Sequence, residues 1–307
     1  MQSEKQPLVS IVMATYNRSN ILGYAIESAL ASTLQDWELI IVGDCCTDDT
    51  AEVVAAFADT RIRFVNLETN YGEQTGPNNL GINLARGTYL AFLNHDDLWL
   101  PDHLQSNIDV LERTGADLVF DQGLGIGMSG NHIDGALTDE LSSYRPWMNA
   151  PATLWVMRRD LALQIGPWQP SWELRCWPSQ AWLHRAYREG RQLVANPRLG
   201  AILIQSGGRS NAYLDRQHSE HAFWWGHMQN PVNILQAVAA LCGKLSRERY
   251  ISPVQCARFA MKALLRRIFY LFGLWPPHPG FWLRYWRKGT FIRELRRRRG
   301  LKDMPRR

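Results

Sequence analysis

Residues 88–101 read TYLAFLNHDDLWLP, and this stretch decides the fold. Its first six residues are mostly apolar or aromatic, which is typical of a buried strand. The strand is expected to end at two adjacent carboxylates, Asp96 and Asp97, and Pro101 suits the first turn of a following helix. Open α/β sheets bind ligands at the carboxyl ends of their strands. The carboxylate pair therefore predicts a divalent cation bound with a phosphate, although solvated helix-cap residues would give the same local pattern.

Strand and helix also alternate on either side of this stretch. Short apolar runs that predict strands occur at 9–13, 37–42, 61–65, 88–93 and 117–120. The short links between strands and helices indicate an α/β fold with a Rossmann-like, mostly parallel sheet flanked by helices. Because right-handed crossovers bring the strand ends to one edge, we expect Arg18, Asp44, Asn78 and Asp96 to line one crevice.

Composition and missing motifs exclude several classes of protein. Neither GxGxxG after the first strand nor GxxxxGK[ST] occurs, which argues against a dehydrogenase and a P-loop NTPase. The 307 residues suffice for one or two domains. The five Cys include no CxxC pair, which predicts reduced thiols in the cytoplasm. We expect neither a signal segment nor a transmembrane helix.

Four segments, taken together, resemble family-two inverting glycosyltransferases of the GT-A fold. They are 9–18 (VSIVMATYNR), 38–50 (ELIIVGDCCTDDT), 76–81 (GPNNLG) and 85–104 (ARGTYLAFLNHDDLWLPDHL). Each segment alone is weak, but all four in this order and spacing are specific. The resemblance implies a nucleotide-sugar donor, with a UDP-sugar as the first expectation, bound together with Mn²⁺ or Mg²⁺.

The resemblance also implies roles for individual side chains. The loop after the first strand would cradle nucleoside and phosphate, and Asp44 would accept a hydrogen bond from the base. Asp96, the last carboxylate of the DxD motif, would bind the metal, with Asp97 as a weaker second ligand. A helix cap at Asp44 and a surface position for Arg18 are the alternatives. The predicted donor site comprises Ala14, Thr15, Tyr16, Arg18, Asp44, Asn78, Asn94, His95 and Asp96, together with Arg209 from a later glycine-flanked loop.

The sequence departs from the family pattern at two of these positions and at the neighbouring Gly43. Asn94 replaces the first carboxylate of DxD, although its amide oxygen still suits a hard cation. Asn78 stands where the family commonly has Arg, which removes one charge for binding phosphate. Gly43 replaces the first of two frequent Asp residues. We therefore expect weaker metal and phosphate contacts from these positions.

The expected general base is also missing. An inverting transfer needs a carboxylate that deprotonates the acceptor hydroxyl. When the family pattern is aligned on Trp182, the position of the base falls at Ala181, which we prefer. When the pattern is aligned on Arg185 instead, the position falls at Ser179. Three explanations for the missing carboxylate remain. It was removed deliberately, the natural protein has lost its activity, or another carboxylate serves as the base, with Glu173 the nearest in sequence.

Two features near residue 210 are further candidates. The glycine-flanked loop 206–211 carries Arg209, which predicts either a lid over the diphosphate or an ordinary exposed turn. His218 and His221, three residues apart, could join the metal site, with a solvated helix face as the alternative. Residues 121–150 are rich in glycine and are expected to form a loop.

The C-terminal region differs in composition from the rest. Residues 258–307 hold 15 Lys and Arg against two carboxylates, so they carry +13 while the remainder carries −8. Residues 253–274 predict a basic amphipathic helix, and the following Trp, Tyr and Arg are typical of a membrane interface. We expect 253–307 to bind an anionic membrane surface; a helical subdomain packed on the core, with a solvated tail, is the alternative. No nucleic-acid motif accompanies the charge, so no nucleic acid is expected.

These observations predict three parts: a nucleotide-sugar-binding half at 1–120, an acceptor-binding half at 121–230 and a membrane-associating helical region at 231–307. The first functional hypothesis is a metal-dependent inverting glycosyltransferase, cytoplasmic and peripheral on the inner face of the cell membrane. Its acceptor would be a glycan or a lipid-linked sugar. The second is a donor-binding protein without catalysis that acts as an assembly partner. A nucleotidyltransferase on the same scaffold is a third.

Overall fold

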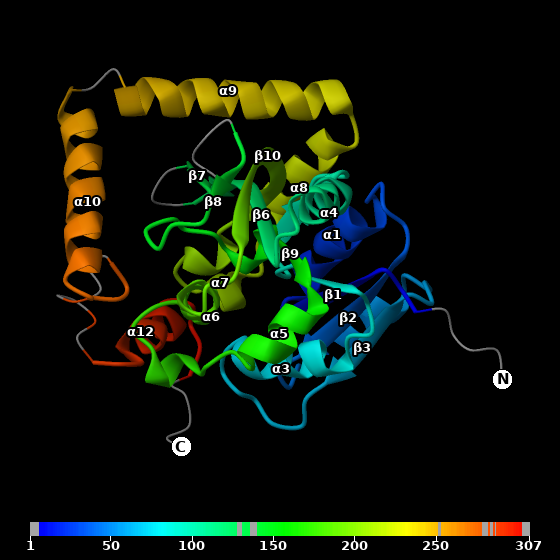
Figure 1. Ribbon diagram of the computed structural model, residues 1–307. Helices are drawn as coiled ribbons and strands as arrows, with labels where there is room; N and C mark the ends of the chain where they lie inside the picture. Colours follow the sequence, from blue (N-terminus) through cyan, green and yellow to red (C-terminus); the bar gives the residue numbers. More distant parts are fainter. Residues whose placement is uncertain are drawn as a thin grey trace.

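One mixed sheet forms the centre of the molecule, and helices cover both of its faces (Figure 1). The computed structural model describes residues 6–127, 131–135, 140–250, 253–277, 282, 285 and 287–302. Within these residues the strand order is β3-β2-β1-β4-β9-β6-β10-β5, with β7 paired to β6 and β8 to β10.

The first half of the sheet is parallel, as expected. Val9 on β1 pairs with Trp37 on β2 and with Tyr89 on β4, so the ends of these strands reach one edge together. Their apolar residues are almost fully buried. The strands are β1 (Val9–Thr15), β2 (Trp37–Gly43), β3 (Ile62–Asn66) and β4 (Tyr89–Phe92). The helices that connect them are α1 (Ser19–Leu30), α2 (Thr50–Ala55) and α3 (Thr75–Leu84).

The second half of the sheet mixes directions. β9 runs antiparallel to both β4 and β6, whereas β10 is parallel to β6. The strands are β5 (Asp97–Trp99), β6 (Leu118–Ile126), β7 (His132–Asp134), β8 (Ser142–Ser143), β9 (Trp155–Arg158) and β10 (Leu193–Ile204). The α-helices in this half are α4 (His103–Thr114), α5 (Arg159–Ile165) and α6 (Pro178–Arg188), and the short 3-10 helices are η1 (Ala152–Leu154), η2 (Ser171–Glu173) and η3 (Ser206–Gly208).

The expected loop at 121–150 is wrong in part, because β6 continues to Ile126 and the short strands β7 and β8 also lie within this stretch. Glycine marks close packing here rather than a turn. A Cβ at Gly123 would lie 2.6 Å from Leu203 Cδ1, and one at Gly125 would lie 2.5 Å from His132 Nε2. Residues 128–130 and 136–139 of that stretch lie outside the described part of the chain.

The stretch after β4 also differs from the expectation. Asp96 lies in the turn, but Asp97 begins β5, which pairs antiparallel with β10. The following helix begins at His103 rather than at Pro101. The sequence pattern did not predict β5, because its three residues are short and its partner strand is about a hundred residues away.

In the described part of the chain, helices α8, α9, α10 and α12 follow β10 and the short α7 (Ala212–Asp215). Helix α9 lies along one side of the body, next to α8, and α10 runs down another side (Figure 1). The helices are α8 (Ser219–Met228), α9 (Pro231–Tyr250), α10 (Pro253–Leu271) and α12 (Thr290–Arg298). Among the described residues, no helix is both long and apolar enough to cross a bilayer. Part of the expected membrane anchor, at 278–281, 283–284, 286 and 303–307, lies outside the described residues.

Candidate active site

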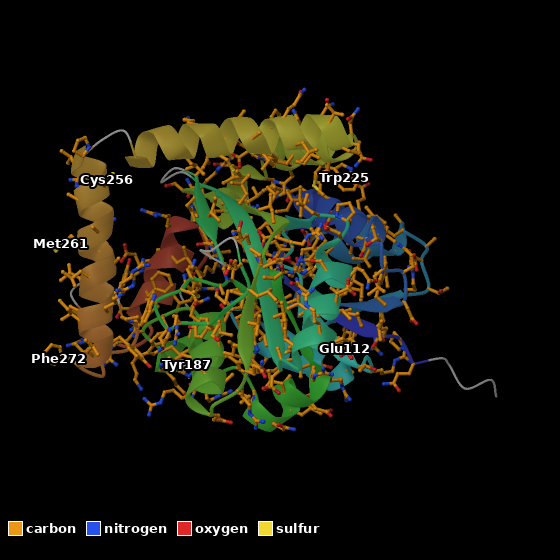
Figure 2. The ribbon with its side chains drawn as sticks, turned by 45° about the horizontal axis from the view of Figure 1, so that its top comes forward. Glu112, Tyr187, Trp225, Cys256, Met261 and Phe272 are labelled. Carbon is orange, nitrogen blue, oxygen red and sulfur yellow. The ribbon has the colours of Figure 1, made fainter. Side chains whose placement is uncertain are left out.

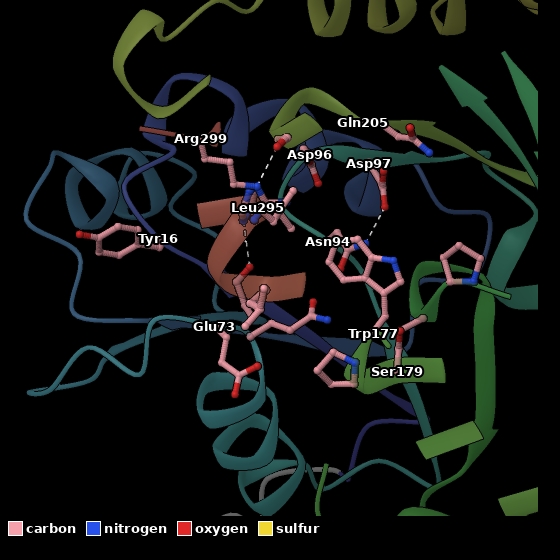
Figure 3. Close-up of a pocket in the computed structure, with 18 of the residues that line it drawn as sticks. Tyr16, Glu73, Asn94, Asp96, Asp97, Trp177, Ser179, Gln205, Leu295 and Arg299 are labelled. Atoms are coloured by element: carbon pink, nitrogen blue, oxygen red, sulfur yellow. Dashed lines mark hydrogen bonds between the residues drawn. The ribbon is translucent and has the colours of Figure 1, made fainter. Parts of the chain in front are cut away.

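A cavity of about 520 Å³ opens at the carboxyl edge of the parallel strands. Tyr16 lies on one side of it, and Trp177 and Ser179 lie on the other, with Asn94 and Asp96 between them (Figure 3). Its walls come from the loops after β1, β2 and β4, the first turn of α6, the end of β10, and α12. This volume lies within the range of sites that hold small ligands, ~300–1,000 Å³.

Asp96 lines the cavity and is held by the end of β10. Its Oδ2 accepts a hydrogen bond of 2.9 Å from the Ser206 hydroxyl, which in turn lies 2.8 Å from Nη2 of Arg18. Burial acts to raise the pKa of Asp96, but His95 and Arg18 outweigh it, so the pKa lies below its usual value. The side chain is therefore an ionised carboxylate, with Oδ1 not used in any hydrogen bond that the structure shows.

Asp97 and Asn94 have different environments from Asp96. Oδ2 of Asp97 accepts from the Thr153 hydroxyl at 2.6 Å and from Asn94 Nδ2 at 2.8 Å, and Oδ1 accepts from the Ile204 amide at 3.1 Å (Figure 3). Burial and the neighbouring Asp96 raise the pKa of Asp97 well above its usual value. Asp97 is thus engaged in joining β5 to β10, whereas the amide oxygen of Asn94 remains available at the cavity wall.

Asp44 reaches the same cavity from the end of β2. Its carboxylate accepts backbone hydrogen bonds from Tyr71 at 2.6 Å and from Gly72 at 2.8 Å. Burial raises its pKa, although these two hydrogen bonds oppose the shift. Asp44 therefore fixes the loop after β3 against the cavity wall.

Of Arg18, Asp44, Asn78 and Asp96, which were expected to line one crevice, only two do so. Asp44 and Asp96 line the cavity, but Arg18 and Asn78 are buried and do not. Arg18 instead donates to the carbonyl of Ala212 at 2.5 Å and to Ser206. The other members of the loop that lie in the wall are Ala14, Thr15 and Tyr16, and His95 lies beside them with Nδ1 3.1 Å from the Ala14 carbonyl oxygen.

His218 and His221, the two histidines predicted to join the metal site, have different environments in the structure. His221 is buried, and its Nε2 lies 3.1 Å from the backbone oxygen of Asp96, whereas His218 is exposed. Burial lowers the pKa of His221 to about 4, so it is neutral near pH 7. Within the described part of the chain, no three His, Cys, Asp or Glu side chains gather as a metal site.

The first turn of α6 faces the cavity, but not through Ala181. Ser179 and Gln180 line the wall, whereas Ala181 is half-buried outside it. The structure therefore puts the alternative base position, Ser179, at the cavity. Glu173 is exposed on η2 and does not line the cavity.

Sequence reasoning missed four charged residues that line this cavity: Glu73, Asp134, Arg296 and Arg299. Asp134 lay in a stretch interpreted as a loop, and the two arginines lay in a tail interpreted as facing a membrane. Arg209, the expected cation of the lid, instead forms an ion pair with Glu220 and does not line the cavity. No local pattern near Asp134 could have found it, because its position depends on the pairing of β7 with β6.

Comparisons with known sequences give the same family as the motifs. A model of the family described as "Glycosyl transferase family 2" matches residues 10–166, just over half of the chain. The "Succinoglycan biosynthesis protein ExoO" of Rhizobium meliloti (strain 1021) is 40% identical over 118 residues, which are 38% of this chain and 34% of that protein. The "UDP-Glc:alpha-D-GlcNAc-diphosphoundecaprenol beta-1,3-glucosyltransferase WfgD" of Escherichia coli is 32% identical over 113 residues, 37% of this chain and 44% of that protein. The chain therefore matches less than half the length of these relatives.

Among solved structures, that of S. aureus TarS 1-349 in complex with UDP-GlcNAc matches with a TM-score of 0.55. The sequence identity is 18%, and the match covers 64% of this chain and 58% of that chain. At this identity the likeness concerns the fold alone, and the expected GT-A fold is confirmed.

Proposed function

The chain belongs to glycosyl transferase family 2, and from this membership we propose that it transfers a sugar from a nucleotide-sugar donor to a glycan or lipid-linked acceptor. The acceptor oxygen attacks the anomeric carbon, the bond from that carbon to the diphosphate breaks, and the configuration inverts. The observation that carries this proposal is that Tyr16, Asp44 and Asp96 line one cavity of suitable size.

The donor is proposed to be a UDP-sugar. Tyr16 and Asp44, at one side of the cavity, would contact the nucleoside, and a carboxylate such as Asp44 accepts hydrogen bonds from the N–H groups of a base. The bound UDP-GlcNAc of TarS supports a uridine nucleotide by analogy of fold. The sugar would then lie toward Trp177 and Ser179.

A divalent metal, Mn²⁺ or Mg²⁺, is proposed to bind beside Asp96. The side chains fit such an ion, because Asp96 is ionised with Oδ1 free of protein hydrogen bonds and the amide oxygen of Asn94 lies in the same wall. Mg²⁺ commonly takes one or two carboxylates and fills its remaining positions with phosphate and water. When bound, the ion neutralises charge on the diphosphate leaving group. Asp97, whose oxygens are both engaged, is proposed to support this site rather than to ligate.

Asp134 is proposed as the general base that α6 lacks. It lines the cavity at the end of β7 and is 8% exposed. Its Oδ1 accepts from Asn149 Nδ2 at 2.8 Å, and its Oδ2 lies 3.1 Å from Nε2 of His132. Asn149 directly precedes Ala150, whose carbonyl accepts from Gln180 on α6, so these contacts hold the carboxylate near α6, where an acceptor hydroxyl could pass it a proton. Glu73 is a poorer candidate, because its Oε1 already accepts two hydrogen bonds, from the Ser171 amide at 2.9 Å and from the Thr75 hydroxyl at 2.8 Å.

The acceptor is proposed to be lipid-linked, with the chain held peripherally on the inner face of the cell membrane. The printed name of WfgD describes an acceptor joined to undecaprenol through diphosphate, which supports this class by relationship. Met261 on α10 and Phe272, directly after this helix, are 55% and 78% exposed and point away from the body (Figure 2). Exposed Arg258 and Lys262 on the same helix would meet anionic lipid head groups.

A thermal-shift panel of UDP-, GDP- and dTDP-sugars, each with and without Mn²⁺, tests the proposal. We expect one nucleotide class to raise the melting temperature, and more so with Mn²⁺, followed by transfer to a polyprenyl-diphosphate-linked sugar. A donor that binds but is neither transferred nor hydrolysed would instead favour the second hypothesis, a binding protein without catalysis. That hypothesis draws on the absence of a carboxylate at Ser179 and Ala181.

A further inference from the structure

The C-terminal helix returns to the cavity, although it is far outside the residues that match the family. Figure 3 shows Leu295 and Arg299 between Tyr16 and Asp96. The residues of this segment that line the cavity are Phe291, Ile292, Leu295, Arg296, Arg299 and Leu301. A tail that was expected to face a membrane thus supplies one wall of the site.

Helix α12 is attached to both sides of the cavity. Before the helix, the Gly289 amide donates to the Leu174 carbonyl at 2.9 Å, and Phe291 packs edge-on against Trp177 with ring centroids 4.6 Å apart. At its other end, the carbonyl of Arg298 accepts from the Asn211 amide at 2.8 Å. The helix therefore spans from the acceptor side to the loop that follows β10.

Arg296 lies at the nucleoside end of this wall. Its guanidinium is 7% exposed and donates to the carbonyls of Gly72 and Lys302. Gly72 belongs to the loop that Asp44 holds. These partners are neutral, and no ion pair to Arg296 is found among the described residues. Asp44 and Glu73 interact with this charge electrostatically without an ion pair, so the guanidinium is only partly compensated and can still bind an anion in the cavity.

Arg299 lies at the opposite end, near the proposed metal. Its Nε donates to the Gly207 carbonyl at 2.7 Å, directly beside Ser206, which binds Asp96. The guanidinium packs closely on this glycine, because a Cβ on Gly207 would lie 2.8 Å from Nη2 of Arg299. The guanidinium also lies 5.9 Å from the ring centroid of Tyr213. The two arginines thus flank the interval between Asp44 and Asp96.

The charge of the cavity requires such cations. Arg296 and Arg299 are the only Lys or Arg among the described residues of its wall, whereas its carboxylates are Asp44, Glu73, Asp96, Asp97 and Asp134. Arg18 is committed to Ala212 and Ser206, and position 78 carries no charge. A diphosphate entering these walls would otherwise meet mainly like charge.

We propose that α12 and the residues directly after it form one wall of the donor site and that Arg296 and Arg299 bind the two phosphates of the donor. This inference rests on the proposed function, because it assigns residues to the diphosphate of a nucleotide sugar. The planar guanidinium suits phosphate oxygens, to which it can donate two hydrogen bonds at once. Arg18 then acts behind the site, by orienting Ser206 and Asp96.

Calorimetry with UDP, GDP, dTDP and their nucleosides, in the presence of Mn²⁺, tests this assignment. The variants are Arg296→Gln and Arg299→Gln, and Arg298→Gln is the matched control, because Arg298 is exposed on the same helix. For the diphosphate that binds the wild type best, each of the first two should weaken binding by ~10-fold or more. Arg299→Gln should bind the corresponding nucleoside as the wild type does, and Arg298→Gln should bind both the nucleoside and the diphosphate as the wild type does. Melting curves establish that each variant is folded; Arg299 is less buried than Arg296, so Arg299→Gln decides the matter if Arg296→Gln does not fold.

The outcomes distinguish a failure of the assignment to Arg296 and Arg299 from a failure of the proposed function. If the wild type binds a diphosphate and folded Arg299→Gln binds it equally well or more tightly, the assignment to α12 is overturned while the proposed function stands. If the wild type binds none of the three diphosphates, the proposed function fails and the assignment fails with it. Inorganic pyrophosphate, as a competitor that lacks a base, should displace the nucleotide from the wild type more effectively than from either variant.

Discussion

A hydrogen bond of 2.9 Å joins the hydroxyl of Ser206 to the carboxylate of Asp96. It connects the end of β10 to the turn after β4, which are 110 residues apart in the chain. Because Ser206 also accepts from Arg18, the hydroxyl fixes one oxygen of Asp96 and leaves the other toward the cavity. The metal site is therefore proposed to depend on a residue that does not touch the metal.

Removing this hydroxyl should weaken metal binding without abolishing it. Loss of a partner that orients a ligand typically costs ~10–100-fold in metal affinity, so Ser206→Ala should raise the Mn²⁺ concentration needed for half-maximal nucleotide binding by about that factor. Titration of Mn²⁺ at fixed nucleoside diphosphate measures it. Ser210→Ala, an exposed position in the same loop, is the control and should behave like the wild type. An unchanged Mn²⁺ requirement in Ser206→Ala would show that Ser206 does not orient the ligand.

The proposed base can be separated from the donor site. Asp134→Asn should lower the rate of transfer by ~10²–10⁴-fold, the usual contribution of a positioned base, while the Kd of the donor stays the same. Single-turnover transfer and calorimetry measure the two quantities. Ala181→Asp and Ser179→Asp are the informative comparisons. If Asp134→Asn is fully active and either of them gains ~10²-fold, the base belongs on α6 and is missing from this chain.

Binding to membranes should depend on α10. Vesicles that contain anionic lipid should retain the chain at low salt and release it at high salt, because each basic residue near the surface contributes ~1 kcal/mol. Met261→Glu with Phe272→Glu should reduce flotation strongly, since both side chains are exposed. Leu163→Glu is the control, because Leu163 is 49% exposed on α5, away from this helix. Equal flotation of the double variant and the control would exclude α10 as the contact.

Acid should loosen the packing of the segment after α10. The ring of His184 stacks on Trp275 with centroids 3.7 Å apart, and burial, aided by Arg188, lowers the pKa of His184 to about 4. Its neutral form is therefore favoured in the folded state. The resulting stability is fully present above the unfolded pKa of ~6.5 and is lost as the pH falls toward 4. Because the ring keeps some contact with solvent, we expect a loss of only about 1 kcal/mol.

Melting curves at pH 7 and pH 5 measure this effect. His184→Phe keeps the stacking without the titration, so its melting temperature should fall less than that of the wild type over this interval. His218→Phe, at an exposed histidine, should follow the wild type. A wild-type and a His184→Phe protein with the same dependence on pH would rule out His184 as the cause.

The parallel half of the fold and its two site carboxylates could be predicted from sequence, because both follow from local patterns. Apolar runs such as that ending at Leu93 fix the strands, and the polar residues after them fix the edge where Asp44 and Asp96 lie. The second half of the sheet could not be predicted in this way, because it depends on pairing between strands that are far apart in the sequence. Gly123 and Gly125 suggested a loop, whereas they admit Leu203 and His132 from the strands beside them.

The charged run 296–299 illustrates the same limit. Four consecutive arginines predict a solvated or lipid-facing surface, and nothing local distinguishes those that turn inward. Arg297 and Arg298 are exposed, but Arg296 is buried because the helix packs through Ile292 onto the cavity. Contacts with Trp177 and Gly207, more than 90 residues away, decide which side of the helix becomes part of the site.

The central claim is that Asp96 holds a cation that binds the donor's diphosphate, and the isosteric Asp96→Asn variant tests it most directly. Calorimetry of the wild type should show tighter binding of UDP, or of the diphosphate that binds best, when Mn²⁺ is added. In Asp96→Asn that gain should disappear, while the nucleoside alone binds as before; Asp109→Asn, at an exposed carboxylate on α4, should keep it. A full gain from Mn²⁺ in Asp96→Asn, or none in the wild type, would contradict the claim.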